Sequence, residues 1–194
     1  MAKLSKPRDT HFVGRIAFLV LFLTASSSFA GIMIDVGGIY YSDSLTTPSD
    51  RTSTQMFYGG GLLLDLGKQA WLGFNYSGIN QTQSTSTTTT FSSSDMGVGF
   101  KYQLGRGKLY NFGAAYNLIS KATYSSGTTN ENWEGTSFLV SFGVSPEVAE
   151  KLYIGMSLNY FSASYTKKIV NNVESSASNG KTWLFPMLTV TKQW

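Results

Sequence analysis

The stretch Thr182–Trp194, TWLFPMLTVTKQW, carries the pattern that determines the fold of this chain. Alternate positions from Leu184 to Trp194 are mostly apolar, and they finish on an aromatic side chain at the last residue. The positions between them become polar toward the end, with two threonines and a glutamine after Met187. Because successive side chains of a β-strand point to opposite faces, this stretch predicts a strand with one apolar face.

Seven earlier segments repeat this alternation, and each is bounded by turn or loop residues. One face of every segment is rich in Leu, Ile, Val, Phe and Tyr, whereas the opposite face is rich in Gly, Ser, Asn and Asp. Each segment is close to the roughly 9–11 residues that a tilted strand needs to cross a bilayer. The eight predicted strands are Ile32–Ser42, Thr54–Leu66, Ala70–Asn80, Asp95–Leu104, Leu109–Lys121, Thr136–Ser145, Leu152–Tyr165 and Thr182–Trp194.

The composition of the two faces indicates what surrounds the sheet. A barrel of eight strands has little room inside, so the face with Gly and Ser is expected to point inward. The face with Leu, Phe and Tyr then points outward, where lipid accommodates it. No segment of residues 31–194 approaches the ~20 apolar residues of a spanning helix, and a chain in lipid without such helices closes a sheet on itself. We predict an all-β fold, one transmembrane up-and-down antiparallel β-barrel of eight strands with a filled polar lumen.

Two alternatives to this architecture remain open. A secreted barrel of the lipocalin or streptavidin type would need the opposite arrangement of faces, with its apolar side chains inside. A ten-stranded barrel would need a further hairpin within Gln81–Ser94 or Thr166–Lys181, and neither stretch has enough apolar positions on one face.

The N-terminal residues have the features of a secretory signal peptide. Four basic residues lie within the first fifteen positions, Ile16–Leu23 is an uninterrupted apolar run, and Ser28 to Ala30 forms a small-x-small cleavage site. The run is too short for a spanning helix, and an uncleaved anchor is the alternative interpretation. We expect residues 1–30 to be the signal peptide and residues 31–194 to be the outer-membrane β-barrel.

Removal of residues 1–30 limits the chemistry of the remaining chain. The leader holds four of the fifteen Lys and Arg residues and one of the eleven Asp and Glu residues, which leaves a net charge of +1. That charge gives no reason to expect nucleic-acid binding. The chain has no Cys, and its only histidine, His11, lies in the leader. Disulfides, thiolate or imidazole metal sites and a Ser-His triad cannot form in residues 31–194, so we expect no catalytic residue, metal or cofactor.

The connections between the predicted strands alternate between short and long. The short ones cover residues 67–69, 105–108 and 146–151, and the long ones cover residues 43–53, 81–94, 122–135 and 166–181. Bacterial barrels of this kind have short periplasmic turns and longer extracellular loops. We therefore expect this protein in the bacterial outer membrane, with both mature termini in the periplasm and the long loops outside the cell.

Outward aromatic residues fall at two heights along the predicted strands. Those toward the long loops are Tyr40, Tyr58, Tyr76, Tyr116 and Tyr160, and those toward the short turns are Tyr102, Tyr110 and Trp194. Rings with a polar tip favour the two interfaces of a membrane. These residues therefore predict two aromatic girdles in contact with outer-membrane lipids.

With these features the chain resembles the small eight-stranded outer-membrane barrels, the family that includes OmpX-like proteins and the OmpA membrane domain. The resemblance covers residues 31–194 as a pattern, without a diagnostic motif, and it implies that Trp194 is the signal by which the barrel assembly machinery recognises the last strand. Lys192 departs from the apolar residue of the family and is expected to snorkel to the interface. Pro186 removes a ladder donor and predicts a bulge or a local gap in pairing. We expect a monomer.

Four charged residues on the inward face, Asp35, Asp65, Asp95 and Lys101, predict a polar network in the lumen. An unpaired buried charge is costly, so Lys101 is expected to pair with Asp35 or Asp65. The pair is either part of a plug of satisfied polar groups or the gate of a narrow channel. Two carboxylates also suggest glycoside hydrolysis, but an interior of eight strands leaves no substrate cleft.

Gly59-Gly60-Gly61 lies inside one of the predicted strands. It lacks the Lys-Ser/Thr pair that a phosphate-binding loop requires. We expect these glycines to make room for a bulky inward neighbour such as Phe57 or Trp71.

The long connections carry most of the expected function. Trp133 is expected to anchor at the outer interface or to contact an extracellular partner. Lys167, Lys168 and Lys181 either meet lipopolysaccharide phosphates or are ordinary solvated charges. We predict a non-enzymatic outer-membrane barrel whose surface loops mediate interaction or support envelope integrity. The alternatives are a narrow passive channel for ions or small solutes and an outer-membrane lipid-modifying enzyme.

Overall fold

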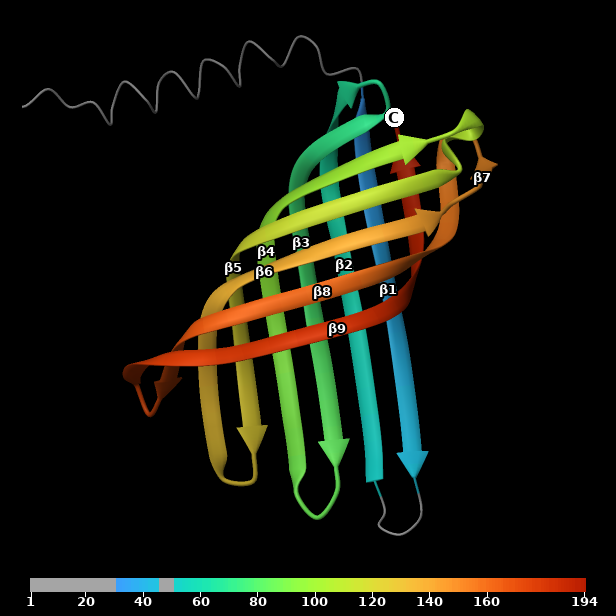
Figure 1. Ribbon diagram of the computed structural model, residues 1–194. Helices are drawn as coiled ribbons and strands as arrows, with labels where there is room; N and C mark the ends of the chain where they lie inside the picture. The colour runs from blue at the N-terminus through green and yellow to red at the C-terminus, as the bar shows by residue number, and fades with distance from the viewer. Residues whose placement is uncertain (1–30, 46–50) are drawn as a thin grey trace, which may run out of the picture.

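The computed structural model describes residues 31–45 and 51–194, which form a single antiparallel sheet rolled into a barrel (Figure 1). The predicted signal peptide, residues 1–30, lies outside the described residues. Eight long strands build the barrel: β1 (Ile32–Leu45), β2 (Arg51–Gly67), β3 (Ala70–Ser84), β4 (Thr88–Leu104), β5 (Tyr110–Ser126), β6 (Thr129–Val144), β8 (Leu152–Val170) and β9 (Val173–Gln193). Two short elements occupy turns, a 3-10 helix over Arg106–Lys108 and the three-residue strand β7 (Glu147–Ala149). Within the described residues, no helix has the length and apolar character needed to cross a membrane.

The barrel closes because both ends of the strand series find partners. From β1 to β6 each strand pairs antiparallel with its neighbour in sequence, β6 pairs directly with β8, and β8 pairs with β9. The ring is completed by β9 and β1, which run antiparallel. The predicted up-and-down barrel of eight strands is confirmed, since β7 pairs only with β8 at the edge of a turn.

The inward and outward faces also follow the predicted parity. On β9 the outward Leu188 is 63% exposed, whereas the next residue, the inward Thr189, is 5% exposed. The same contrast recurs around the ring, so the large apolar side chains cover the outside and the polar and small ones fill the inside. This arrangement is the reverse of a water-soluble barrel, and it is the arrangement that lipid requires.

The apolar outer surface forms a belt that ends partway along the strands. Beyond Tyr76, for example, the outward positions of β3 are Gly78, Asn80, Thr82 and Ser84. The strands continue past the belt as polar antiparallel ribbons, which we call the hairpin extensions. They comprise residues 42–45, 51–55, 78–84, 88–94, 121–126, 129–136, 162–170 and 173–182.

The hairpin extensions correct the prediction that residues 122–135 and 166–181 are long loops. These stretches are paired strands, and the connections shrink to tight turns at Gly127 and at Asn171-Asn172, which have positive φ values. Residues 81–94, which were also predicted as a long connection, pair closely from Ser84↔Thr88 downward. Ser and Thr in these stretches favour strands. Their outward faces are mostly polar because they lie beyond the belt, although Val173 at the β8–β9 turn is exposed.

The closure between β1 and β9 is shorter than the other joins. Six residue pairs join these strands, from Met33↔Gln193 to Gly38↔Leu188, whereas β1 and β2 pair over fourteen. Pro186 lies two residues beyond the last pair, so the local gap predicted from this proline is present on the β1 side. Pairing with β8 continues without a bulge through Leu158↔Pro186.

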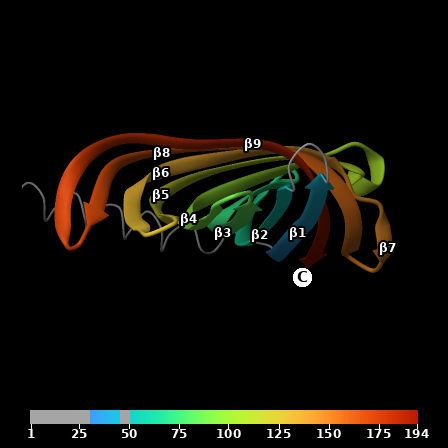
Figure 2. The same cartoon turned by 90° about the horizontal axis from the view of Figure 1, so that it is seen from below.

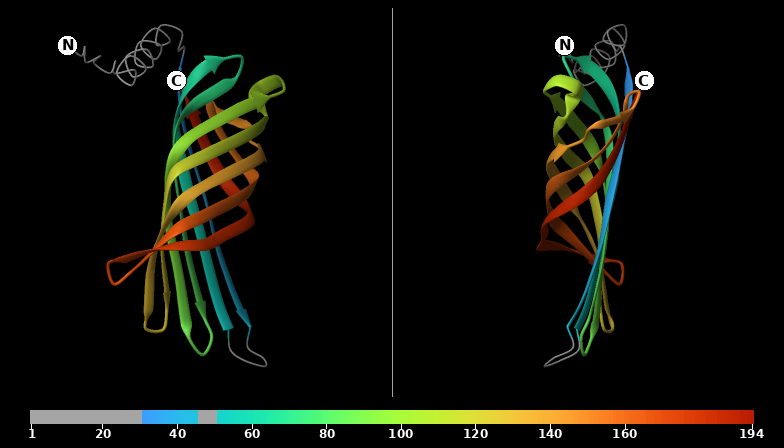
Figure 3. Two further views of the ribbon diagram at one scale, coloured as in Figure 1. Left: turned by 60° about the vertical axis from the view of Figure 1, so that its left-hand side comes forward. Right: turned by 90° about the vertical axis from the view of Figure 1, so that its right-hand side faces the viewer.

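Past this closure β9 bends away from β1, and the β8–β9 hairpin points to the side of the other three (Figures 1 and 3). Viewed from below, β5, β6, β8 and β9 form one wall that arches over β1, β2 and β3 (Figure 2). The C-terminus lies at the same end as the start of β1, opposite the hairpin extensions (Figure 1). Near that end the Lys192 Nζ donates to the backbone carbonyl of Glu150 at 2.8 Å, so this lysine binds the neighbouring turn.

Candidate functional site

An ion pair between a buried lysine and a partly buried aspartate crosses the lumen in the half of the barrel nearest the termini. The Lys101 Nζ on β4 lies 2.7 Å from Oδ1 of Asp35 on β1 and 3.0 Å from Oγ1 of Thr191 on β9. Strands β4 and β9 stand on opposite sides of the ring, so this single side chain spans the interior. The Lys101 side chain is only 7% exposed, and of the two partners left open by the sequence it pairs with Asp35.

A second crossing lies closer to the terminal end. The Gln193 Nε2 on β9 donates to Oε1 of Gln103 on β4 at 2.6 Å, and the Trp71 Nε1 donates to the same oxygen at 3.2 Å. The Lys108 Nζ donates to Gln193 Oε1 at 2.7 Å. Trp71 also packs with the buried side chains of Met33 and Leu63. Paired polar groups and an aromatic ring therefore fill this end of the lumen.

The four charged residues predicted to form one network do not do so. Asp95 is fully buried and accepts hydrogen bonds from the hydroxyls of Ser93, Ser120 and Ser137, at 3.1, 2.5 and 2.8 Å. Asp65 stands apart from both groups, because its Oδ1 accepts from the backbone N–H of Gly67 in the adjacent turn at 2.7 Å. In place of one network there are three separate groups. These are the Lys101–Asp35 ion pair, Asp95 among its serines, and Asp65 in its turn.

An aromatic layer blocks the lumen toward the hairpin extensions. The ring centroids of Phe57 and Phe185 lie 4.6 Å apart, and those of Phe57 and Phe161 lie 6.3 Å apart. The three rings come from β2, β9 and β8 and are almost completely buried. Ile79, which is also fully buried, extends the same apolar cluster.

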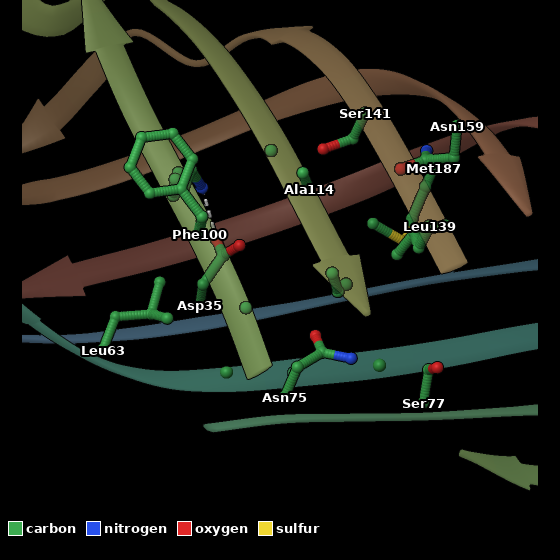
Figure 4. Close-up of a pocket in the computed structure, with 18 of the residues that line it drawn as sticks. Asp35, Leu63, Asn75, Ser77, Phe100, Ala114, Leu139, Ser141, Asn159 and Met187 are labelled. Carbon is green, nitrogen blue, oxygen red and sulfur yellow. Dashed lines mark hydrogen bonds and ion pairs between the residues drawn. The ribbon is translucent and has the colours of Figure 1, made fainter. Parts of the chain in front are cut away.

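A cavity of about 70 Å³ lies between the ion pair and the aromatic layer (Figure 4). Inward glycines, among them Gly59 and Gly61, form part of its wall. A Cβ on Gly59 would lie 3.3 Å from the Phe57 ring, so this glycine does make room for a bulky inward neighbour. Polar groups also face the cavity, including Ser77 and Asn159 (Figure 4).

A second, more open cavity of about 240 Å³ lies at the mouth of the barrel, among the hairpin extensions. We call it the cup. It is lined by three aromatic residues, two glutamines and a lysine, together with one threonine and one glycine. These residues are Phe91, Tyr124, Trp133, Gln81, Gln83, Lys181, Thr89 and Gly180.

The aromatic wall of the cup is held by a chain of polar contacts. The rings of Tyr124 and Trp133 are stacked, with centroids 5.2 Å apart and an interplanar angle of 13°. The Trp133 Nε1 donates to Oε2 of Glu131 at 2.8 Å, and the Lys168 Nζ donates to Oε1 of the same carboxylate at 2.5 Å. Both Glu131 oxygens are therefore engaged, and the indole ring has a fixed orientation. Trp133 faces the cup, so its expected role as an anchor at the outer interface is wrong.

Acid is expected to loosen this wall. The hydrogen bond from Lys168, and next that from Trp133, lower the pKa of Glu131 in the folded protein below its ordinary value of 4.5. A carboxyl group with a depressed pKa contributes stability that is fully present above its unfolded pKa and is lost as the pH falls through its folded pKa. We expect the free energy of unfolding of the wild type to decrease over that acidic range by more than that of Glu131→Gln. If the free energy of unfolding depended on pH identically in the two proteins, the stabilising role of the Glu131 carboxylate would be contradicted.

The three lysines, for which lipopolysaccharide contact and ordinary solvated charge were the two interpretations, have separate partners. Lys167 lies 2.9 Å from Glu174, and this ion pair raises the pKa of its ammonium group. Lys168 binds Glu131. Lys181 instead points into the cup, where its Nζ donates to Oε1 of Gln81 and lies 5.7 Å from the centroid of the Phe91 ring. Burial lowers the pKa of Lys181, and none of the described carboxylates lies within ion-pair distance of it.

The predicted girdle residues all lie on the outer face. Tyr40, Tyr58, Tyr110, Tyr116, Tyr160 and Trp194 are exposed, and Tyr76 and Tyr102 are partly exposed. The Tyr58 and Tyr76 rings are neighbours, with centroids 6.3 Å apart. The backbone N–H of Trp194 donates to the carbonyl of Ile32 at 2.9 Å, which ties the last residue to β1. Among the residues that the structure describes, no cluster of His, Cys, Asp or Glu suits a metal ion.

The cup was missed by sequence reasoning, although part of its signal was present. Phe91, Trp133 and Lys181 occupy odd positions, the inward parity of their strands, but all three fall within the predicted long connections. Tyr124 occupies an even position on β5 and still faces inward, because a bulge between Asn117 and Ser120 reverses the parity of that strand. A bulge inserts an extra residue and shifts the alternation, and nothing in the sequence placed it.

Comparison with solved structures finds partial similarity to three outer-membrane and surface proteins. Neisserial surface protein A is 14% identical with a TM-score of 0.44, over 84% of this chain and 94% of that protein. The translocator domain of the autotransporter NalP from Neisseria meningitidis is 10% identical with a TM-score of 0.44, over 95% and 69%. The outer membrane protein OmpT of Vibrio cholerae is 12% identical with a TM-score of 0.29, over 86% and 53%. No protein-family model and no curated protein matches the chain, so these similarities concern the fold alone.

Proposed function

We propose that this chain is a non-conducting barrel of the bacterial outer membrane that acts as a surface-binding protein through its hairpin extensions. The observation that carries the proposal is the set of contacts across the lumen. Lys101 reaches Thr191, and Gln193 reaches Gln103, in each case between the opposite strands β4 and β9. A pore of eight strands is narrow enough to be filled by side chains, and here polar pairs and an aromatic layer occupy it.

The hairpin extensions support the binding role. They present polar outward faces beyond the apolar belt and, at the mouth of the barrel, the cup with its aromatic and cationic side chains. Loops and strand ends carried on a rigid scaffold are common positions for binding residues. No hydrolytic or transfer chemistry is proposed, and the protein is assigned a non-enzymatic role.

The orientation belongs to the same proposal. The hairpin extensions face the outside of the cell and both termini lie in the periplasm, as is usual for barrels with short periplasmic turns. The apolar belt contacts outer-membrane lipids, with its tyrosines at the interfaces. The protein is a monomer, and its last strand with Trp194 is the segment offered to the barrel assembly machinery.

Conductance measurements test the closed lumen. In planar bilayers the purified protein is expected to give no reproducible unitary steps. Lys101→Ala is expected to remain silent as well, because the Gln103–Gln193 crossing and the Phe57 layer still obstruct the path. A porin inserted into the same bilayer shows that steps would be detected. Unitary steps whose size changes in Lys101→Ala would contradict the proposal and favour a narrow channel.

A further inference from the structure

We infer that the cup binds a sugar acid, a hexose ring that carries a carboxylate, from the fluid outside the cell. The inference rests on the proposed function, because it requires the hairpin extensions to face that fluid. It is carried by three features of the cup that coincide in one cavity: a fixed aromatic wall, a half-buried cation without a counter-ion, and two primary amides.

The aromatic wall supplies a flat apolar surface. Tyr124, Trp133 and Phe91 all line the cup, and the polar chain from Lys168 through Glu131 holds the indole in place. A rigid ring loses little conformational entropy when a ligand binds. The C–H face of a hexose ring is apolar and flat, so it matches such a surface while its hydroxyls remain at the edge.

The cation supplies the charge selectivity. Lys181 donates one hydrogen bond, to Gln81, and an ammonium group has three N–H donors. Two donors are therefore left for a ligand. A partly desolvated charge without a counter-ion is unfavourable, and a carboxylate on the ligand would relieve that cost with a charge-assisted hydrogen bond. The other two lysines of this region, Lys167 and Lys168, already have carboxylate partners.

The amides supply recognition of hydroxyl groups. Gln81 and Gln83 line the cup on the β3 side, and each amide can both donate and accept hydrogen bonds. Sugar hydroxyls have the same dual capacity, whereas an inorganic anion or an aliphatic carboxylate offers no such set. A cavity of about 240 Å³ is below the usual range of roughly 300–1,000 Å³ for ligand pockets, which suits one saccharide unit rather than a longer segment.

Binding is tested with the protein folded in detergent micelles, by isothermal titration calorimetry with glucuronate, glucose and inorganic phosphate. We expect glucuronate to bind at least about tenfold more tightly than either control, a factor that corresponds to about 1.4 kcal/mol. Lys181→Met, which keeps the aliphatic stem, is expected to weaken glucuronate binding by a similar factor. Lys167→Met, which removes a lysine paired outside the cup, is the matched control and is expected to bind normally.

Several outcomes would overturn the inference. These are absence of glucuronate binding, equal binding of phosphate, equal binding of glucose, or unchanged binding by Lys181→Met. Tyr124→Ala provides an independent arm, since loss of the wall should weaken glucuronate without changing the charge of the cup. An oligosaccharide ending in glucuronate, compared with the free sugar, distinguishes a polysaccharide end from a soluble metabolite as the source. Conductance is measured on the same preparations. Absence of glucuronate binding then contradicts the inference about the cup, whereas unitary conductance steps contradict the closed lumen of the proposed function.

Discussion

Asp35→Ala is expected to lower the free energy of unfolding by about 3–5 kcal/mol, the usual cost of removing one partner of a buried ion pair. The reason is the position of Lys101, whose side chain is almost completely enclosed and has Asp35 as its only carboxylate partner in the described chain. Without that carboxylate, Thr191 offers the ammonium group a neutral oxygen. The measurement is a urea titration of folding in lipid vesicles, followed by the altered gel mobility of the folded barrel.

Two further variants separate the ion pair from the general effect of removing a charge. Asp65→Ala is the matched control, because in the described part of the chain the Asp65 carboxylate accepts a single hydrogen bond, from the backbone N–H of Gly67. A loss of about 1 kcal/mol or less is expected. Asp35→Ala combined with Lys101→Met removes both charges and should recover much of the stability, since apolar replacements of a whole buried pair are often neutral. An additive loss in the double variant would show that the two residues act independently.

Gly97→Ala is expected to cost about 3 kcal/mol or more, at or beyond the upper end for overpacked positions. Gly97 lies at a bulge where β4 loses its register with β5 between Met96 and Gly97. A Cβ at this position would meet the carbonyl oxygen of Tyr116 and lie 2.5 Å from the Cα of Asn117. Both are backbone atoms, so no side-chain rotation relieves the clash, and the bulge itself must move.

Gly61→Ala is the matched control for this prediction. Gly61 also faces the lumen, but there a Cβ would be 3.3 Å from its nearest neighbour and would project into the central cavity. A small adjustment accommodates it, so we expect a change of less than about 1 kcal/mol. The fraction of protein that folds in vesicles is compared for both variants. Equal folding yields would show that the bulge is more adaptable than its geometry indicates.

The membrane-spanning part of the fold could be predicted from the sequence because lipid imposes a two-residue period. Leu188, Val190 and Trp194 are outward for the same reason as their counterparts on seven other strands, and repetition made the weak alternation reliable. Lys101 and Asp35 could be named as partners because their parity placed both inside. The choice between Asp35 and Asp65 depended on strand tilt and register, which parity alone does not define.

The hairpin extensions were harder to predict, because the two-residue period that lipid imposes ends with the apolar belt. Thr88–Ser94 and Thr129–Thr136 are polar on their outward faces, so they have the composition of loops although they are strands. Their apolar side chains, such as Phe91 on β4 and Trp133 on β6, occur singly and pack against each other over the intervening strand β5, with centroids 6.1 Å apart. Contacts of this kind depend on tertiary structure and on the bulges that set which face each strand presents.

The short join between β1 and β9 makes the barrel a rolled sheet whose two edge strands are hydrogen-bonded over less than half of the length of β1. Beyond Gly38 and Leu188 the spacing between the two edges is set by the curvature of the sheet, and no ladder bond limits it. Lys181 lies on the free part of β9, while Gln81 and Phe91 lie on the facing strands β3 and β4. We therefore expect that a small uncurling of the sheet would widen the cup without breaking a β1–β9 ladder bond, because the six pairs near the termini hold that end of the barrel closed.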